Sequence, residues 1–194
     1  MSENVGHAVV AGVRDLLPVL RERAQDTEDA RVVPAESVKA LEETGFFRLL
    51  QPAAHGGYEA DPVTFLTAVR LIASACGSTG WVASVLGVHP WQLALFPPRA
   101  QEEVWGADQA TRMSSSYAPT GRAEAVDGGH RLTGRWSFSS GCGHATWVLL
   151  GAIVPEGDGR PPWVPRSPGT ILMAWNGGLS MRPRQGLGLL RGSP

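Results

Sequence analysis

The chain has 194 residues, of which 43% are hydrophobic and 18% charged, and its formal net charge is -1. This composition is typical of a folded globular protein and excludes a chain that is mainly disordered. Because the sequence carries neither a basic excess nor a run of like charges, it predicts no nucleic-acid partner and no membrane-surface partner.

The first 110 residues show the apolar periodicity of helices. Apolar residues recur every three or four positions from Val9 to Leu20, which predicts one amphipathic helix that Pro18 bends. A second helix is expected to have Pro34 at its first position and to stop at Gly45. Its inward-facing residues are predicted to be Val38 and Leu41.

A third helix is expected after Asp61, because a carboxylate can accept hydrogen bonds from the free N–H groups at a helix start and Pro62 comes next. The residues predicted to line its buried side are Phe65, Leu66, Val69, Ile72 and Cys76. Cys76 is therefore expected to be a thiol of the core.

The chain has two cysteines, Cys76 and Cys142, which form no CxxC motif. This predicts neither a zinc site nor a disulfide framework, and we expect no bound metal. No apolar run reaches the roughly 18 residues of a membrane span. We therefore expect a reduced, cytoplasmic protein.

Residues 81–88 predict another apolar helix, which runs into His89 and Pro90, and residues 91–96 predict a separate short helix. A last helix is expected to close at Gly106. The period then changes to the alternation of strands in residues 111–119, 123–136 and 145–154, with a turn signal at Asp127–Gly128.

Helices first and strands after them predict the α+β class, with an N-terminal helical domain over residues 1–110 and a partial β domain over residues 111–154. Residues 155–194 are rich in glycine, proline and arginine and show neither helical nor strand period. This predicts an irregular tail that buries little apolar surface. The strand at 145–154 is thus expected to lack a continuation of its sheet.

Five stretches within residues 10–154 resemble one protein family, in that family's order: "ALEETGFFRLLQPAAHGGYEADP", "IASACGSTGWVASVLGVHPWQLALFP", "AQEEVWG", "SSSYAPTG" and "GRWSFSSGCGHATWVLLGA". On these stretches the sequence resembles the flavin-dependent monooxygenases built on the acyl-CoA dehydrogenase fold, the oxygenase components of two-component phenol hydroxylases. Within them it is most similar to the group that hydroxylates 3-hydroxy-9,10-secoandrostatriene-dione, in steroid catabolism, and 4-hydroxyphenylacetate.

The resemblance implies an N-terminal helical domain, a β-barrel-like domain and a C-terminal helical bundle. This sequence lacks the bundle, so we expect a C-terminally truncated chain. A frameshift is one hypothesis for its Gly/Pro/Arg-rich tail.

In the family, the loop that matches "WSFSSGCGH" lies beside the isoalloxazine ring of the flavin. The resemblance implies that Ser139, Ser140 and Gly141 contact the cofactor and that the Ser140 hydroxyl hydrogen-bonds flavin N5. A hydroxyl can both donate and accept a hydrogen bond, which suits a nitrogen that changes its protonation state. From the residues alone, the same serines and glycines also fit a hairpin corner.

Three neighbouring residues form the second expected contact. By resemblance Ser115 contacts the phenol and the flavin, while Ser116 and Tyr117 lie along the flavin. The alternative, from the residues alone, is a solvated strand end. Trp81 matches a tryptophan that packs against the flavin; otherwise it would be an ordinary core residue.

By resemblance His89 contacts the substrate hydroxyl and acts as its base, and the alternative is a helix-terminal residue before Pro90. With ordinary pKa values, full proton transfer from a phenol to histidine spans about 3.5 units, or roughly 4.8 kcal/mol. This is small beside a barrier of about 16 kcal/mol for a turnover near 10 per second.

The resemblance implies ortho-hydroxylation of a phenol with reduced flavin (FMNH2 or FADH2) and O2, through a C4a-hydroperoxyflavin. The sequence has no GxGxxG motif, so a separate NAD(P)H:flavin reductase is expected to supply the reduced flavin. A homo-oligomer, a tetramer in the full-length family, is also implied. Two alternatives stay open: an acyl-CoA dehydrogenase-type oxidoreductase, and an inactive truncated remnant.

Overall fold

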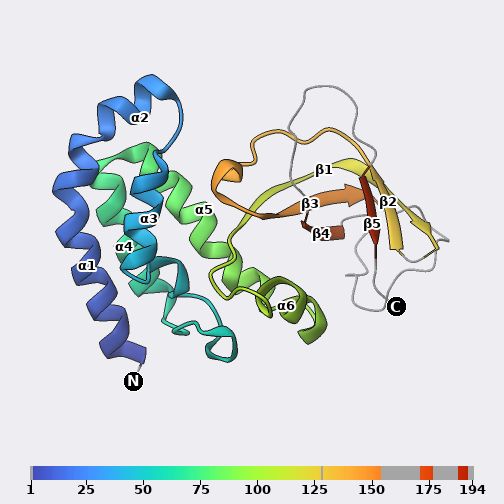
Figure 1. Cartoon of the computed structure of the whole chain (residues 1–194), viewed down its shortest axis with the longest axis horizontal. Coiled ribbons are helices and arrows are strands. Elements are labelled where there is room, and N and C mark those ends of the chain that lie inside the picture. Colours follow the sequence, from blue (N-terminus) through green and yellow to red (C-terminus); the bar gives the residue numbers. More distant parts are fainter. Residues whose placement is uncertain (1, 128, 154–170, 177–187, 192–194) are drawn as a thin grey trace. The chain divides into compact units, whose positions relative to one another are not determined.

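The computed structural model describes residues 2–127, 129–153, 171–176 and 188–191 (Figure 1). The chain forms two compact units. The helical unit comprises Met1–Met113 and Gly143–Ala145, and the sheet unit comprises Ser114–Cys142 and Thr146–Pro194.

The helical unit is built around a set of α-helices with short 3-10 turns between them (Figure 1). The α-helices are α1 (Ser2–Glu22), α2 (Ala24–Ala30), α3 (Ala35–Glu43), α4 (Pro62–Ala75), α5 (Gly77–Leu93) and α6 (Pro98–Trp105). The 3-10 turns between them are η1 (Phe46–Arg48) and η2 (Ala53–His55). Of the helices that the structure describes, none combines the length and apolar character needed to cross a membrane.

The predicted start of α4 is confirmed, and the start of α3 lies one residue later than predicted. The Asp61 carboxylate accepts a hydrogen bond from Thr64 N at 2.9 Å, and Pro62 is the first residue of α4. The Thr64 hydroxyl also donates to this carboxylate, and these hydrogen bonds lower the pKa of Asp61. Pro34 immediately precedes α3, and Gly45 follows it with a φ of 84°.

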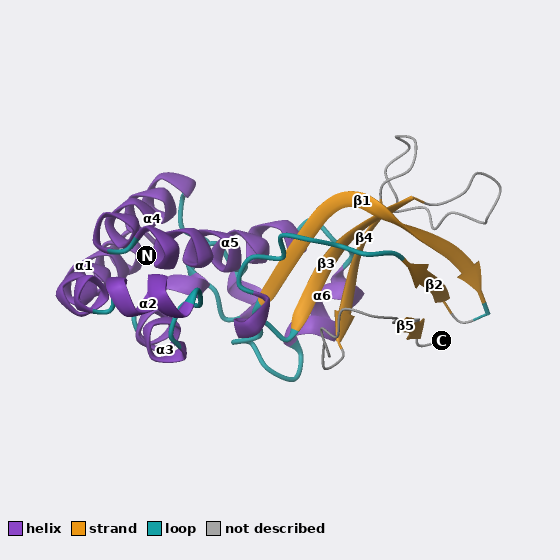
Figure 2. Ribbon diagram, turned by 90° about the horizontal axis from the view of Figure 1, so that it is seen from above, coloured by secondary structure: helices purple, strands orange, loops and turns teal. Residues whose placement is uncertain are grey.

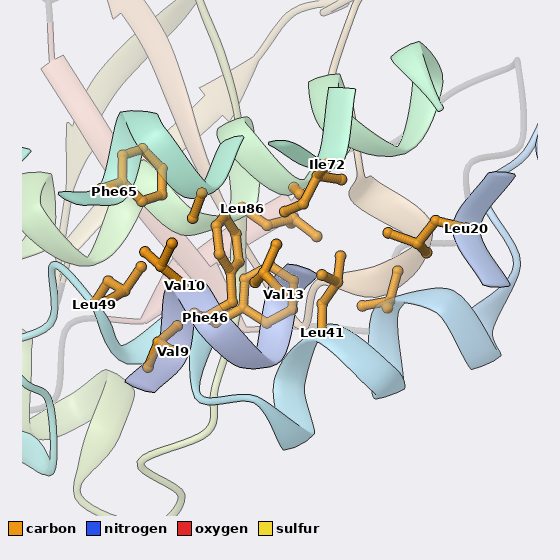
Figure 3. Packing of buried hydrophobic residues seen from close by; sticks show 14 of the residues in the cluster. Val9, Val10, Val13, Leu20, Leu41, Phe46, Leu49, Phe65, Ile72 and Leu86 are labelled. Atoms are coloured by element: carbon orange, nitrogen blue, oxygen red, sulfur yellow. The ribbon is translucent and has the colours of Figure 1, made fainter. Parts of the chain in front are cut away.

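The core of the helical unit lies where α1, α3, α4 and α5 meet, as Figure 3 shows. Phe46 stacks on Phe65 with ring centroids 5.5 Å apart. Most of the predicted inward residues of α1 and α3 are buried there: Val9, Val10, Val13, Leu20, Val38 and Leu41. Leu16 and Leu17 are partly buried against the same core. Burial of each such side chain contributes about 1.5–3 kcal/mol relative to exposure.

On α4, the predicted buried face is confirmed at three of its five residues, and a fourth, Val69, is partly buried. Phe65, Ile72 and the Cys76 thiol are buried, whereas Leu66 is 59% exposed. The buried positions of α4 are Phe65, Ala68, Ile72 and Ala75, which recur at helical spacing. Leu66 lies about 100° around the helix from Phe65, so it faces solvent.

Two corrections concern the helices themselves. The two helices predicted on either side of Pro90 are one, because α5 continues through Pro90 to Leu93. A proline inside a helix costs about 3 kcal/mol, and complete burial of Leu93 favours keeping this last turn. The sequence also predicted no helix at 24–30, where α2 forms from mostly polar residues and buries Thr27.

The sheet unit holds one described sheet, with strand order β4-β3-β1-β2-β5 (Figure 2). Its strands are β1 (Met113–Val126), β2 (Gly129–Thr133), β3 (Trp147–Ile153), β4 (Ile171–Asn176) and β5 (Gly188–Arg191). The pairs β1–β2, β2–β5 and β3–β4 are antiparallel. Val126 pairs with Gly129, on either side of the predicted turn.

The predicted fold class, a helical domain followed by a small sheet, is confirmed. A β-barrel-like domain was expected by resemblance. The described strands form one sheet with β4 and β5 at its edges. The tail was predicted to contain no strand, and this is wrong for its described residues, because β4 continues the sheet beside β3 and β5 pairs with β2. The rest of residues 155–194 lies outside the described residues.

The strand order shows how the stretch between β2 and β3 must run. β2 and β3 are separated in the sheet by β1, so residues 134–146, the crossover segment, lead from one side of β1 to the other. Because β2 and β3 are not neighbours, the interpretation of the serines and glycines at 139–143 as a hairpin corner is wrong.

Candidate functional site

His89 lies inside α5, two turns after Trp81, and its side chain is almost completely buried at 1% exposure. It is not a helix-terminal residue, since the helix continues to Leu93. Burial lowers the pKa of His89 to about 4, because the charged imidazolium loses hydration. His89 is therefore neutral at pH 7 and can accept a hydrogen bond.

The low pKa of His89 raises the free energy needed to transfer a proton to it from a phenol. A phenol with an ordinary pKa near 10 and an imidazole near 4 differ by about 6 units, so full transfer requires roughly 8 kcal/mol. This is about half of a barrier of about 16 kcal/mol. His89 is thus suited to accept a hydrogen bond from a phenol, and full transfer needs a donor that stabilises the phenolate.

Trp81 is one of three large apolar side chains that are exposed on α5 or directly after it. Its side chain is 64% exposed, which contradicts its interpretation as a core residue in this chain. Trp91 and Leu95, at 54% and 69% exposure, lie ten and fourteen positions further along. An exposed indole offers a flat apolar face for stacking.

A small cavity of about 20 Å³ lies near the end of α5. Its lining includes Leu86 and Pro90 from α5, Glu42 from α3, and Arg112. The volume is enough for one water molecule and far too small for a flavin.

Arg112 connects several parts of the helical unit. Its guanidinium forms an ion pair with Glu42 at 2.6 Å and donates a second hydrogen bond, from Nε, to the His144 carbonyl oxygen at 2.9 Å. It also lies over the Phe47 ring, 5.7 Å from the ring centroid. Through these contacts, residues 143–145 of the crossover segment are held to α3 and η1.

In the sheet unit, the serines at the start of β1 are buried. Ser114, Ser115 and Ser116 are 0%, 7% and 5% exposed, which excludes the interpretation of "SSS" as a solvated strand end. In a strand, successive side chains point to opposite faces. Ser114 and Ser116 therefore share one face of β1, and Ser115 and Tyr117 the other.

The crossover segment is hydrogen-bonded along one face of β1. The Ser116 hydroxyl donates to the Ser137 carbonyl oxygen at 2.7 Å, and the Ser139 hydroxyl donates to the Ser114 hydroxyl at 3.1 Å. Further along β1, Thr120 donates to the Arg135 carbonyl oxygen at 2.9 Å. The segment thus runs antiparallel to β1 over its polar side chains.

The residues expected beside flavin N5 follow directly after these anchors. Ser139, Ser140 and Gly141 are all partly exposed. Gly141 has a φ of 76°, a left-handed conformation that favours glycine. The Cys142 amide donates to the Ser139 carbonyl oxygen at 3.1 Å and closes a tight turn around Ser140.

The structure separates the roles predicted for residues 115–117. The Ser116 hydroxyl is engaged with the crossover segment, so its side chain already has a structural partner. Ser115 lies on the other face of the strand, and among the described residues no hydrogen bond to its hydroxyl is found. Tyr117 is 45% exposed.

Arg112, Ser114 and Ser137 also contribute to this region, although the sequence did not predict a role for them. The sequence does contain a pattern that indicates such a face. Residues 112, 114, 116 and 120 are polar and are separated by two or four positions, so they share one face of an extended segment. This pattern could not be interpreted without knowing what lies opposite this face. Among the described residues, no group of three His, Cys, Asp or Glu side chains is arranged to hold a metal ion.

Comparison with known families gives one match over more than half of the chain. Residues 7–112 match the model of the acyl-CoA dehydrogenase N-terminal domain.

Curated relatives match the helical unit and part of the sheet unit. The chain is 60% identical over 166 residues to the flavin-dependent monooxygenase oxygenase subunit HsaA of Rhodococcus jostii, covering 83% of this chain and 43% of that protein. It is 46% identical over 153 residues to the FADH(2)-dependent resorcinol hydroxylase oxygenase component of a Rhizobium strain, covering 78% of this chain and 37% of that protein. The chain therefore spans about two fifths of the length of these relatives.

Among solved structures, the chain is similar to the crystal structure of 3-HSA hydroxylase from Rhodococcus sp. RHA1. The TM-score is 0.76 with 62% sequence identity, and the match covers 80% of this chain and 40% of that one.

Proposed function

Because the chain belongs to the acyl-CoA dehydrogenase N-terminal domain family, we propose that it acts in the oxygenase component of a two-component flavin-dependent monooxygenase. The reaction is ortho-hydroxylation of a phenol with reduced flavin and O2. Similarity to an oxygenase subunit and to a resorcinol hydroxylase supports this reaction class. The structural observation that carries it is His89, a buried and neutral imidazole suited to a phenol hydroxyl.

The described residues fit a flavin in three respects. Trp81 offers an exposed indole face for stacking, Ser139 and Ser140 are partly exposed hydroxyl groups, and Gly141 provides a backbone turn without a side chain. The bound flavin, FMNH2 or FADH2, would supply the reducing equivalents that activate O2. The chain would hold the ring through Trp81, Ser139, Ser140 and Gly141, with Ser115 and Tyr117 as further contacts. Ser116, whose hydroxyl is bound to the Ser137 carbonyl oxygen, is not assigned a side-chain contact to the ring.

The proposed role of Ser140 is to form a hydrogen bond with the flavin ring and so modulate its reactivity. Its hydroxyl can donate to or accept from flavin N5, and one such hydrogen bond contributes only about 1 kcal/mol, too little to bind the cofactor alone. A neutral group also adds no charge beside the ring.

His89 and Ser115 have roles toward the phenol. Neutral His89 accepts the hydrogen bond of the phenol hydroxyl and draws electron density toward the ring carbon that is hydroxylated. A hydrogen bond from Ser115 to the phenol oxygen stabilises negative charge there and lowers the unfavourable energy of transfer to His89. Exclusion of water from such a site would limit loss of oxidising equivalents as hydrogen peroxide.

The proposal includes a separate NAD(P)H:flavin reductase as partner and a homotetramer as assembly. The similarity to proteins named as oxygenase components supports the reductase. Light scattering after size-exclusion chromatography tests the assembly. Two free thiols, Cys76 and Cys142, are consistent with a cytoplasmic location.

The decisive experiment is a single turnover with the whole chain. The protein is mixed anaerobically with FMNH2 or FADH2 and with resorcinol or 4-hydroxyphenylacetate, O2 is admitted, and hydroxylated product and hydrogen peroxide are quantified. Hydroxylated product above the level with free flavin supports the proposal. Peroxide alone from a flavin-bound protein contradicts it.

Two further measurements on the same protein separate the two alternatives. Oxidation of an acyl-CoA substrate by the oxidised-flavin protein, without phenol hydroxylation, indicates a dehydrogenase. Absence of flavin binding at micromolar protein indicates an inactive remnant.

A variant pair tests the role of His89 in the same assay. His89→Gln is expected to lower product formation about 100-fold, the lower end of what a positioned base contributes. His7→Gln, on the exposed side of α1, is the matched control and should keep the wild-type yield. Equal yields from both variants would remove His89 from the mechanism.

A further inference from the structure

Four side chains hold the crossover segment: Arg112 and, along β1, Ser114, Ser116 and Thr120. We propose that Arg112, Ser114 and Ser116 are positioning residues that set the conformation of residues 137–144, and through it the place of Ser140. The consequence for catalysis rests on the proposed function, whereas the positioning itself does not.

The first support is the order of the contacts. Going up β1 from Ser114 to Ser116, the partners in the crossover segment go down from Ser139 to Ser137. Thr120 continues this order with Arg135. The pairs Ser114–Ser139 and Ser116–Ser137 have the register of an antiparallel ladder, with side chains in place of one backbone, so they specify a register for residues 137–139. The Thr120–Arg135 contact is offset from this register by two residues.

The second support is strain at the residue between the two anchors. Phe138 has a φ of 59° and its side chain is 94% exposed. A bulky residue rarely adopts this left-handed conformation, which persists only where surrounding contacts impose it. An exposed ring gains nothing from burial that would offset the strain. The hydrogen bonds of Ser137 and Ser139 are the described contacts that impose it.

The third support is the anchor at the other end of the segment. In the helical unit, Arg112 donates to the His144 carbonyl oxygen while it is paired with Glu42. A guanidinium paired in this way is fixed in direction, because both contacts use donors of the same planar group. Ser140 thus lies between the anchored Ser139 and the anchored His144.

Cys142 provides a local probe that needs no flavin. It is partly exposed and lies inside the anchored stretch, whereas Cys76 is buried and accepts a hydrogen bond from Thr79. The rate at which a thiol reagent such as 5,5′-dithiobis(2-nitrobenzoic acid) labels Cys142 in the folded chain therefore reports how well the segment is held. A Cys142→Ser variant identifies the signal of Cys142.

Ser116→Ala removes one anchor and is expected to raise the labelling rate of Cys142 about fivefold, the factor that corresponds to one hydrogen bond of about 1 kcal/mol. The matched control is Ser137→Ala, which removes a serine side chain from the same segment but keeps the carbonyl that Ser116 binds. The control should label at the wild-type rate, and Ser116→Thr should restore it. A wild-type rate for Ser116→Ala, or equal acceleration in both alanine variants, would overturn the proposal.

The Arg112 anchor is tested by two variants that differ in severity. Arg112→Met removes the ion pair and the His144 contact and is expected to accelerate labelling at least as much as Ser116→Ala. Glu42→Gln keeps Arg112 and its contact to His144, so it remains informative if Arg112→Met does not fold. We expect a smaller, two- to threefold acceleration for Glu42→Gln, and no acceleration in either folded variant would contradict the anchor.

The link to catalysis is measured separately, in the single-turnover assay. Ser116→Ala is expected to shift the products from hydroxylated phenol toward hydrogen peroxide because Ser140 is less well placed. Its melting temperature should fall only slightly, as expected for the loss of one hydrogen bond. An unchanged product ratio with faster Cys142 labelling would overturn the catalytic consequence. If the wild-type chain binds no flavin, the proposed function fails while the labelling result still decides the positioning.

Discussion

His89 is a buried titratable residue, and its pKa predicts how stability depends on pH. The folded value is about 4 and the unfolded value near 6.5, so between these values the unfolded state binds a proton that the folded state does not. This contribution is complete above about pH 6.5, and it decreases as the pH falls, by up to about 3 kcal/mol at pH 4. Urea denaturation at pH 7 and pH 4.5 measures the loss in the free energy of unfolding.

His89→Gln is the control for this prediction, because glutamine does not titrate. The variant should lose less stability than the wild type between pH 7 and pH 4.5, by about 2 to 3 kcal/mol. Parallel pH profiles for the two proteins would mean that His89 keeps an ordinary pKa in the folded state.

Phe138 has a strained backbone conformation, and its side chain is exposed to solvent. Its φ of 59° suits asparagine, which tolerates the left-handed region, and its ring is 94% exposed. Phe138→Asn is therefore expected to raise the free energy of unfolding by about 0.5–1 kcal/mol. Phe138→Ala has no side-chain amide that can form the local hydrogen bond by which asparagine tolerates this conformation, so it should give no such gain. Chemical denaturation measures the free energy of unfolding of both variants and of the wild type. Equal stability of Phe138→Asn and Phe138→Ala would contradict the strain argument.

Among the helices, the contact between α4 and α5 depends on a glycine. A Cβ at Gly80 would lie 2.5 Å from the Cβ of Ala73 and 2.6 Å from its Cα, so the two helices would have to move apart. Gly80→Ala is expected to lower the free energy of unfolding by about 1–3 kcal/mol, although alanine is the better helix former.

Gly77, at the start of the same helix, is the matched position. A Cβ there would meet no atom within 4 Å. Gly77→Ala should leave the free energy of unfolding unchanged or raise it slightly. Urea midpoints of the two variants and the wild type give the comparison, and a stable Gly80→Ala protein would show that α4 and α5 do not pack this closely.

For the whole chain, exposed apolar side chains on α5 and directly after it predict interaction with apolar probes. Trp91 on α5 and Leu95, two residues after its end, are more than half exposed, as is Trp81 on α5. Exposed apolar groups of this size bind hydrophobic dyes and promote association. We expect 8-anilinonaphthalene-1-sulfonate fluorescence that falls by at least half in the Trp91→Gln/Leu95→Gln double variant. Arg99→Gln, an exposed residue at the start of α6, should keep the wild-type signal.

Local signals in the sequence were enough to predict most of the helical unit. The capping carboxylate of Asp61, the glycines after α3 and α6, and the spacing of Val9, Val13 and Leu20 depend only on residues within a few positions of one another. The order of helices before strands followed in the same way. Resemblance to a family supplied the candidate residues and the reaction class, which periodicity could not.

Contacts between distant residues decided the rest. The burial that makes His89 a weak base, the exposure of Trp81, and the order of the strands are set by which segments pack together, and local period does not encode this. The clearest case is "RMSSS", whose polar side chains would be ordinary in an isolated strand. Their hydrogen bonds depend on the strand order. Because β1 separates β2 from β3, the connecting segment passes along β1 and forms hydrogen bonds with these serines.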